Sequence, residues 1–264
     1  MEKKDVCTLM YHDVYDTSAL DSGFNIDSNY PYKLHVVKFE EQISAIADYL
    51  KLHCIDKDYI RLSFDDGGVS FYTIIMPILE KYGFKGYFYI ATNYIGKDGF
   101  LTEAMINEMS DRGHRIGGHS HTHRQRMNEL SYDELKEVWG LCLRILSRIT
   151  GESCTTASLP NGFTSKVILQ VLEELGIEEL YTSEPTEDSR MYGGMTIRGR
   201  YGIRSTMNLK DVLAIAFEEK VKRKFRRKKA ILNIAKKVMG SSYIKVREFI
   251  FKHKNEESID NRCW

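Results

Sequence analysis

Short apolar runs of strand length alternate along this chain with stretches of helical periodicity. Strands are predicted at 5–12, 60–64, 86–92, 155–159 and 178–183, with a further short one just before residue 119. Helices are predicted between them at 39–53, 72–83, 102–114, 131–151 and 165–176. Strands and helices at this spacing are typical of parallel strands joined by right-handed crossovers. About six such units fit before residue 200, so the pattern predicts an α/β fold built as a barrel that is closed or nearly closed.

Local signals place several of the helix ends. Ser131 and Glu134 form a capping-box pattern at the start of the helix at 131–151. Thr102 is in position to cap the helix at 102–114, and Gly83 closes the helix at 72–83. Pro77 lies inside that last helix, where it either kinks the helix or marks its true start.

Composition favours one compact globular core. Of the 264 residues, 42% are hydrophobic and only 4 are proline. The 5 cysteines are scattered without a C-x-x-C pair, which argues against a disulfide framework and against a thiolate zinc site. No apolar run reaches membrane-spanning length, and the N-terminus lacks the apolar region of a signal peptide. We therefore expect a protein of the cytoplasm, without a signal peptide.

A basic extension follows the predicted barrel. Residues 220–254 hold 14 Lys and Arg against a single acid, Glu248, which leaves 24 basic and 36 acidic residues in the rest of the chain. We predict a barrel domain at 1–217 and a basic helical extension at 218–264. The extension either packs an apolar stripe on the barrel or lies on an anionic membrane surface, at the inner face of the membrane. Nucleic acid is the least favoured partner, because no recognition motif accompanies the charge.

Polar clusters fall where the predicted strands end. Tyr11-His12-Asp13 follows the first strand, Asp65-Asp66-Gly67-Gly68 the second, His119-Ser120-His121-Thr122-His123 the fourth and Pro160-Asn161-Gly162 the fifth. In folds of parallel strands and helices, the chemistry gathers at the carboxyl ends of the strands. These clusters are therefore expected to share one site.

One aspartate and two histidines suit a divalent metal. Zn²⁺ accepts imidazole nitrogen and carboxylate oxygen, and a catalytic site keeps three protein ligands and an open position. His119 and His123, four apart on a helical turn, together with one aspartate would complete such a set, and the second aspartate would be free to act as a base. Taken singly, Asp-Gly is common turn chemistry and the histidine run is typical of a solvated loop as much as of a metal site. Their combination at matching strand ends favours the metal site.

These motifs resemble those of the polysaccharide deacetylases, the NodB homology domain of carbohydrate esterase family 4. The resemblance runs from YHDV at 11–14 through SFDDGG at 63–68, ILEKYGFKGYFYIAT at 78–92 and GHRIGGHSHTHRQRMNELSYDELKEV at 113–138 to SLPNG at 158–162. A weaker likeness extends over 197–217. It implies a distorted, incomplete (β/α) barrel and the removal of N-acetyl groups from amino sugars or glycans.

The resemblance also implies the role of each matching residue. Asp65 would be the general base for a metal-activated water, and Asp66, His119 and His123 would hold the metal. Zn²⁺ is the expected ion, with Co²⁺ and Ni²⁺ as alternatives. Ser120 would be a structural hydrogen bonder, and His121 is not expected to be a ligand.

The chain departs from the family pattern at two places. The third motif is SLPNG, without the arginine that many members use to hold the base, so Arg198 or Arg204 is predicted to supply that charge or to bind substrate. No downstream L-x-x-x-H motif supplies a catalytic acid, and His12 is the substitute candidate, with a structural hydrogen bond as its alternative role. Asn161 is predicted to bind the acetyl oxygen of the substrate.

The sequence therefore predicts a metal-dependent N-deacetylase. The expected substrate is an N-acetylated sugar, an oligosaccharide or a lipid-linked glycan. Three alternatives remain open: hydrolysis of another amide, such as a formamido group on a lipid-linked sugar; a catalytically degenerate domain that binds glycan without turning it over; and an adaptor that acts through the basic extension.

Overall fold

The computed structural model describes residues 6–124, 126–162 and 164–227. The chain divides into two units, Met1–Glu219 and Lys220–Trp264. In the second unit the described residues, 220–227, are helical. Most of the basic extension, 228–264, lies outside the described residues, so its predicted role and the predicted domain boundary stay predictions.

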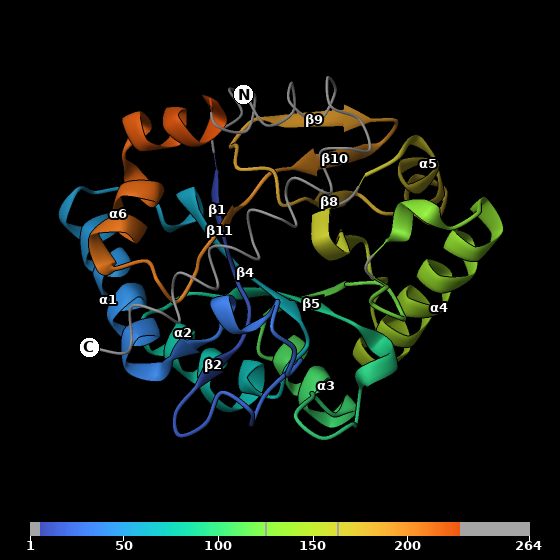
Figure 1. Ribbon diagram of the computed structural model, residues 1–264, viewed down its shortest axis with the longest axis horizontal. Coiled ribbons are helices and arrows are strands. Elements are labelled where there is room, and N and C mark those ends of the chain that lie inside the picture. Colours follow the sequence, from blue (N-terminus) through green and yellow to red (C-terminus); the bar gives the residue numbers. More distant parts are fainter. Residues whose placement is uncertain (1–5, 125, 163, 228–264) are drawn as a thin grey trace, which may run out of the picture. The chain divides into compact units, whose positions relative to one another are not determined.

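The first unit is built on one curled, mostly parallel sheet (Figure 1). The strand order is β11-β1-β4-β5-β6-β7-β8-β10-β9, and only the β9–β10 pair is antiparallel. The strands are β1 (Cys7–Tyr11), β4 (Ile60–Asp66), β5 (Gly86–Ile90), β6 (Arg115–Gly118), β7 (Thr156–Ser158), β8 (Glu179–Tyr181), β9 (Ser189–Tyr192), β10 (Met195–Arg198) and β11 (Tyr201–Gly202). Because β9 and β11 end the sheet at opposite edges, it is a half-barrel, as the incomplete barrel prediction requires.

Helices cover the outer face of the sheet. They are α1 (Val36–Leu52), α2 (Met76–Lys81), α3 (Glu103–Asp111), α4 (Tyr132–Thr150), α5 (Lys166–Glu174) and α6 (Leu209–Phe217). Thr102 caps α3, and Ser131 forms a capping box with Glu134 at the start of α4, both as predicted. Pro77 marks the start of α2, which follows a π-helical turn at Phe71–Ile75, so the predicted single helix at 72–83 is two pieces.

The two faces of the sheet differ in chemistry. Alternate residues of β4 point outward into an aromatic core, where Phe64 stacks on Phe88 at 5.0 Å and meets Phe39 of α1 edge-on at 6.0 Å. The residues between them, Arg61, Ser63 and Asp65, share the opposite, inner face because strand side chains repeat every two residues. The inside of the half-barrel is therefore polar and can carry charged groups.

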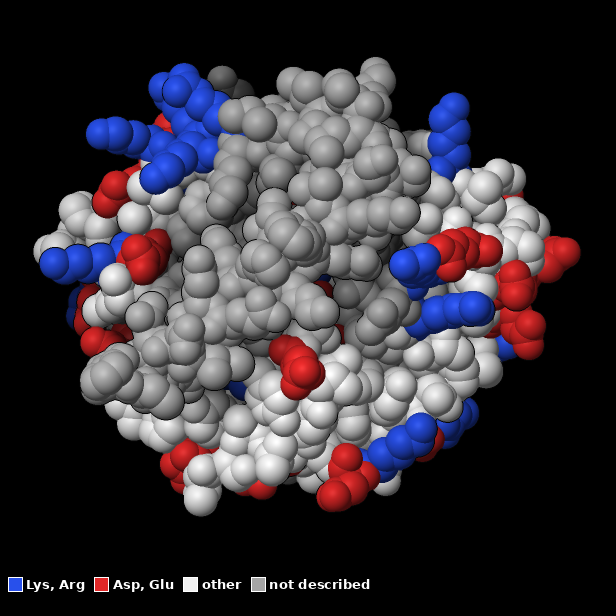
Figure 2. All heavy atoms as spheres, in the orientation of Figure 1, with Lys and Arg blue, Asp and Glu red and all other residues white. Residues whose placement is uncertain are grey.

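Two short strands lie outside the main sheet. β2 (Val14–Tyr15) and β3 (Leu34–His35) pair in parallel, and the segment between them, 16–33, has only a short 3₁₀ turn at Tyr30–Tyr32. Around the rim of the molecule, acidic and basic side chains are interspersed (Figure 2). Among the described residues, no helix combines the length and apolar character needed to cross a membrane.

Candidate metal and catalytic site

Asp66, His119 and His123 come together at the carboxyl ends of β4 and β6. Their ligand atoms all lie within 4.8 Å of one another, the one such group of three among the described residues. The Nε2 atoms of His119 and His123 lie 3.4 and 3.1 Å from the same oxygen, Oδ1 of Asp66. A carboxylate oxygen and two imidazole nitrogens facing one point fit the donor set of a zinc-type divalent cation.

Unusual backbone conformations build this cluster. Asp66 has φ 93°, Ser120 φ 62° and His123 φ 50°, in the left-handed region that side chains other than glycine rarely adopt. The positive φ of Asp66, followed by Gly67 at φ 94°, turns the chain so that adjacent aspartates can both serve the site. Since strained residues of this kind concentrate at functional sites, the backbone supports a working role for the cluster.

The histidine loop is not helical, which corrects the predicted helical turn. The strand ends at Gly118, as predicted, but residues 119–124 form an irregular loop. Its conformation is set by Ser120, whose Oγ accepts a hydrogen bond from the backbone N–H of His123 at 3.0 Å. The loop after β5 also donates to it, from Thr92 N to Ser120 O and from Asn93 N to His121 O.

Hydrogen bonding fixes the tautomer of His119. Its Nδ1 lies 2.9 Å from the carbonyl oxygen of Ser158, which can only accept, so Nδ1 carries the proton. In the neutral ring, the free electron pair is then on Nε2, on the side of Asp66, as a metal ligand requires. His121 makes a different contact, with Nδ1 2.9 Å from Thr92 Oγ1, and does not belong to the cluster.

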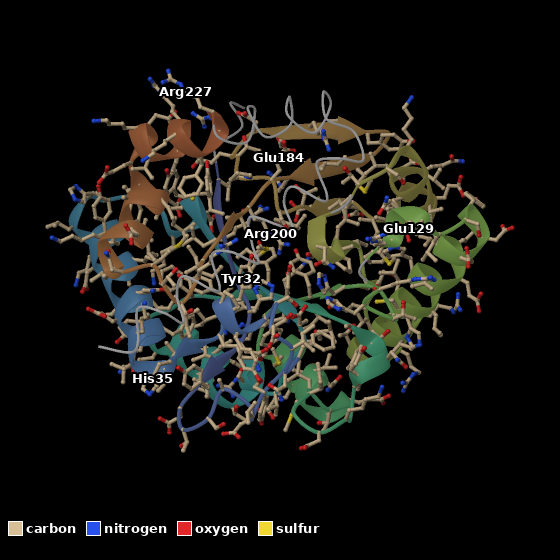
Figure 3. The ribbon with its side chains drawn as sticks, in the orientation of Figure 1. Tyr32, His35, Glu129, Glu184, Arg200 and Arg227 are labelled. Carbon is tan, nitrogen blue, oxygen red and sulfur yellow. The ribbon has the colours of Figure 1, made fainter. Side chains whose placement is uncertain are left out.

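Asp65 is bound on both oxygens by Arg200. Nη1 and Nη2 of Arg200 donate to Oδ1 and Oδ2 of Asp65, each at 2.7 Å, and Ser158 Oγ donates to Oδ2 at 3.0 Å. Arg200 is 0% exposed, and its Nε donates to the carbonyl oxygen of Thr182. Arg200 lies near the centre of the molecule in Figure 3. This bidentate pair orients Asp65 and keeps it charged.

The arginine predictions were wrong about the partner of Asp65. Arg198 lies two residues earlier, and its Nε donates to Glu179 Oε1 at 2.9 Å, near Arg61 at the start of β4. Arg204 follows β11 and donates to the hydroxyl of Tyr32 at 3.2 Å. Strand register separates Arg198 from Arg200: the end of β10 is level with Tyr181, and the chain must continue past Gly199 to reach Asp65.

Gly199 is the local signal that could have identified Arg200. A Cβ at Gly199 would come within 2.2 Å of the carbonyl oxygen of Glu184, so only glycine fits there. The Arg200 N–H donates to that same carbonyl at 2.7 Å, which holds the arginine against the sheet. A glycine directly before an arginine in a strand-like stretch therefore marked the position.

The pKa values of both aspartates lie below their ordinary range. Burial alone would raise the pKa of Asp65, but the charges of Arg200 and His119 and the hydrogen bonds from Arg200 outweigh it. For Asp66, burial is likewise outweighed by hydrogen bonds to His119 and His123, and the pKa falls well below the usual value. Burial lowers the pKa of His119, but the charges of Asp65 and Asp66 prevail and raise it. Both carboxylates are therefore charged at neutral pH: Arg200 balances the charge of Asp65, and Asp66 faces the two histidines.

His12 and Asn161 also lie at the carboxyl ends of their strands. His12 follows β1, and its ring packs on Tyr32 at a centroid distance of 4.7 Å. Its Nδ1 is buried without a hydrogen-bond partner in the described structure. Asn161 follows β7, is exposed and has φ 56°. Their predicted roles, like the substrate role of Arg204, stay predictions.

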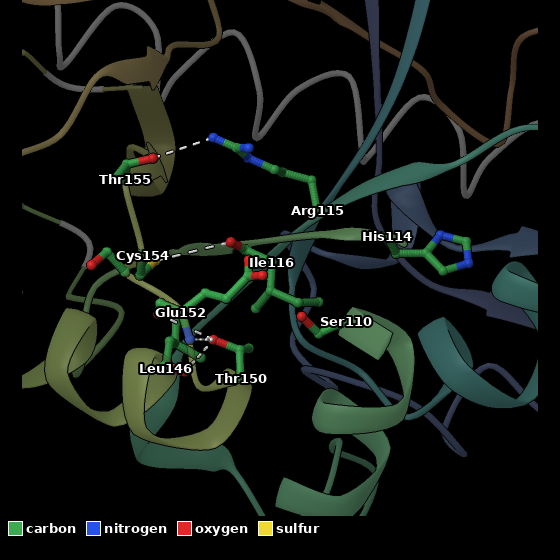
Figure 4. A pocket seen from close by; sticks show the side chains of 10 residues that line it. Ser110, His114, Arg115, Ile116, Leu146, Thr150, Glu152, Cys154 and Thr155 are labelled. Atoms are coloured by element: carbon green, nitrogen blue, oxygen red, sulfur yellow. Dashed lines mark hydrogen bonds between the residues drawn. The ribbon is translucent and has the colours of Figure 1, made fainter. Parts of the chain in front are cut away.

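A small pocket opens at the opposite end of the strands (Figure 4). It lies between the start of β6, at Arg115 and Ile116, and the end of α4, at Leu146 and Thr150. It does not include the group formed by Asp66, His119 and His123. We assign no function to it.

Comparison with known proteins agrees with the geometry. A family model for polysaccharide deacetylases matches residues 53–180, which hold both aspartates and the histidine loop. Over these residues the chain is similar to the polysaccharide deacetylases. This likeness supports deacetylation as its class of activity.

The chain is also similar, at low identity, to a deacetylase of known substrate. The peptidoglycan-N-acetylmuramic acid deacetylase PdaA of Bacillus subtilis (strain 168) is 28% identical over 126 residues, 47% of this chain and 46% of that protein. The match thus spans less than half the length of that relative.

Solved structures share the fold. The deacetylase PplD of Streptococcus pyogenes, in complex with acetate, superimposes with a TM-score of 0.68 at 20% identity, covering 80% of this chain and 97% of that one. BC0361, a polysaccharide deacetylase from Bacillus cereus, has a TM-score of 0.65 at 19% identity and covers 80% of this chain and 68% of that one.

Proposed function

We propose that this chain is a metal-dependent deacetylase that removes an N-acetyl group from an amino sugar or glycan. The observation that carries the proposal is the placement of an arginine-bound carboxylate, Asp65, directly beside the cluster of Asp66, His119 and His123. A general base next to a three-ligand metal site is the arrangement that amide hydrolysis by an activated water needs.

Four residues at the ends of β4 and β6 have proposed roles as metal ligands or as the general base. Asp66, His119 and His123 would hold a divalent cation, with Zn²⁺ expected and Co²⁺ or Ni²⁺ as alternatives. When bound, the cation supplies a Lewis acid that polarises the acyl carbonyl and acidifies water. Among the described residues, Oδ2 of Asp65 accepts from two donors and Oδ1 from Arg200 alone, so Oδ1 would take the proton from the attacking water.

The later proton transfer needs an acid. His12 is the proposed donor to the leaving amine, because it directly follows β1, which pairs with β4 so that Tyr11 lies opposite Phe64, the residue before Asp65. With Nδ1 buried, Nε2 would be the nitrogen that faces the substrate. Asn161 and Arg204 are proposed to contact the glycan from the loops after β7 and β11.

The experiment combines metal analysis with an acetate assay. Purified protein is analysed for bound metal and assayed for acetate release from N-acetyl sugars, glycans and lipid-linked precursors. Asp65→Asn is expected to keep the metal and lose turnover, and His119→Ala to lose both. His121→Ala is the matched control, because His121 lies in the same loop but outside the cluster. Unchanged metal content in His119→Ala would contradict the site assignment.

A glycan-binding domain without turnover is the second candidate function. It was favoured by the missing arginine and the missing acid, but Arg200 now pairs with Asp65 and removes the first reason. Wild-type protein that binds metal and glycan yet releases no acetate from any substrate would support this second candidate. Release of formate instead of acetate would point to a deformylase.

A further inference from the structure

The segment at 16–33, between β2 and β3, is folded around two buried charges. Lys33 is 3% exposed, and its ammonium donates to Ala19 O, Ser22 O and Asn25 Oδ1 at 2.6, 2.6 and 2.7 Å. All three of its donors are therefore used within the segment. Asp13 is 2% exposed, and its Oδ1 accepts from Ser22 Oγ at 2.5 Å and from Ser70 Oγ at 2.9 Å. The segment is thus tied down although it has almost no regular secondary structure.

Close packing of backbone against Asp13 adds to this rigidity. A Cβ at Gly23 or at Gly68 would come within 1.9 Å of an Asp13 carboxylate oxygen. The backbones of 16–33 and of the loop after β4 therefore meet at one carboxylate. Since the loop after β4 begins just after Asp66, the segment is held in a fixed place relative to the proposed metal ligands.

From this segment, Asn29 reaches Asp66. Its Nδ2 donates to Oδ2 of Asp66 at 2.9 Å, whereas both histidine nitrogens face Oδ1. The two oxygens of the carboxylate are therefore separated in role, one directed to the histidines and one held by the amide. A carboxylate held in this way offers one oxygen to a cation.

From the same segment, Phe24 reaches His123. The two rings stack with centroids 4.6 Å apart and planes 25° apart. Behind Phe24, Tyr94 and Phe100 pack against it at 4.6 and 5.1 Å, so its ring is itself supported. His123 is the most exposed of the three proposed ligands, at 16% of its side chain. Within the described part of the chain, its ring nitrogens have no hydrogen bond to a backbone carbonyl like that of His119. Phe24 supplies the contact that sets its ring plane.

We propose that Asn29 and Phe24 are positioning residues for the metal and that segment 16–33 is a preassembled clamp on two of the three ligands. This inference rests on the proposed function, because it requires that Asp66, His119 and His123 bind a cation. The clamp restricts Asp66 to coordination through Oδ1 and holds His123 in its coordinating orientation before the metal arrives. Outer contacts of this kind tune affinity because they reduce the freedom that ligands lose on binding.

The test measures metal binding directly. Zn²⁺ affinity is determined by competition with a chromophoric chelator, and the visible spectrum of the Co²⁺-loaded protein reports the coordination. Asn29→Ala and Phe24→Leu are each expected to weaken Zn²⁺ binding by about tenfold or more, the range typical of outer-shell substitutions. Asn29→Ala is also expected to change the intensity of the Co²⁺ bands, because the freed Oδ2 can then join the coordination. Phe24→Tyr keeps the ring and should keep the affinity.

Matched controls separate the clamp from general damage. Phe84→Leu removes a buried aromatic ring that lies beside Lys57, away from Phe24 and His123, and Asn93→Ala removes an exposed asparagine from the loop after β5. Both controls should bind Zn²⁺ as the wild type does, and thermal unfolding of the metal-free variants confirms that they fold.

The outcomes distinguish the two proposals. If the wild type and His119→Ala bind Zn²⁺ and Co²⁺ equally or not at all, the proposed function fails. If binding depends on His119 but Asn29→Ala and Phe24→Leu retain wild-type affinity and spectrum, the site stands and the clamp is wrong.

Discussion

Arg200 carries a buried charge that only its fork geometry can satisfy. It places two parallel hydrogen bonds on Asp65, one on Thr182 O and one on Ser158 Oγ. A lysine keeps the charge but not the two parallel bonds. We expect Arg200→Lys to lower kcat for acetate release by about 10²-fold, because a catalytic group displaced by about 1 Å loses that much.

Arg200→Leu tests the structural side of the same pair. It leaves Asp65 buried without its partner, and the free energy of unfolding in urea should fall by about 3–5 kcal/mol. Arg198→Leu is the matched control, since Arg198 pairs with Glu179 in a partly exposed setting, where the pair contributes about 1 kcal/mol or less. Equal losses of unfolding free energy in Arg198→Leu and Arg200→Leu would show that the Asp65 contact is not special.

His12→Phe tests the proposed role of His12 as the general acid. His12→Phe keeps a ring against Tyr32 but cannot protonate the leaving amine. We expect kcat to fall by about 10²-fold, in the range of general acid catalysis, with metal content unchanged. Activity near the wild-type level would assign the acid to another group and leave His12 a packing role.

Site residues that lie in short motifs at strand ends could be predicted from the sequence. Arg200, whose position depends on the register of β10, could not. Asp65, Asp66, His119 and His123 were named because strand-end motifs and spacing carry their chemistry. Arg200 lies 135 residues from Asp65, in a stretch with three arginines, and only the level at which β10 ends decides among them. Asn29 lies in a segment without periodic apolar residues, so its hydrogen bond to Asp66 could not be predicted from the sequence.

Helices and strands with periodic apolar residues could be predicted from the sequence. Short or exposed strands without such a pattern could not. The amphipathic helices α1, α3, α4 and α5 and the buried strands β1 and β4 to β8 follow the predicted order. The antiparallel pair of β9 and β10 was not predicted, because β9 is largely exposed and alternates weakly. β2 and β3 are only two residues each and depend on the contacts of Asp13 and Lys33.

His114 joins α2, α3 and β5 and must stay neutral to do so. Its side chain is 0% exposed; Nδ1 accepts the Gly86 N–H at 3.0 Å, and Nε2 lies 3.3 Å from Glu80 Oε1. Burial, with the charges of Lys85 and Arg112, outweighs Glu80 and lowers the pKa of His114 to about 4. Protonation would remove the acceptor that Gly86 uses.

A loss of stability at mildly acidic pH follows from that shift. An unfolded chain takes up the proton near the ordinary histidine pKa of about 6.5, before the folded one does, so stability should fall as pH drops from about 6.5 to 4. His114→Gln should reduce this fall by up to about 3 kcal/mol, measured by urea unfolding at each pH. The pKa values of Asp65, Asp66 and Glu80 are also lowered, but their contributions to the free energy of unfolding are lost at lower pH in both proteins. The difference between the two pH curves therefore isolates His114. Parallel curves for the two proteins would contradict the assignment.

At the scale of the whole molecule, the half-barrel gathers the proposed catalytic groups from strands that are spread across the sheet. Asp65 and Asp66 end β4, His119 follows β6, Ser158 ends β7, and Arg200 follows β10. The site therefore forms only when the sheet has assembled from β4 to β10. A cation bound there would stabilise the whole assembly and not one loop.

Metal should accordingly raise the unfolding temperature. At a free Zn²⁺ concentration of about 100 times Kd, binding to the folded state alone adds about 2.7 kcal/mol. For a unit of this size that corresponds to a rise in Tm of about 5–10 °C. The measurement compares thermal unfolding after chelation with EDTA and after Zn²⁺ is restored. His119→Ala should lose the rise and His121→Ala should keep it, because only His119 shares the cluster with Asp66. A rise of equal size in both variants would place the bound metal elsewhere on the chain.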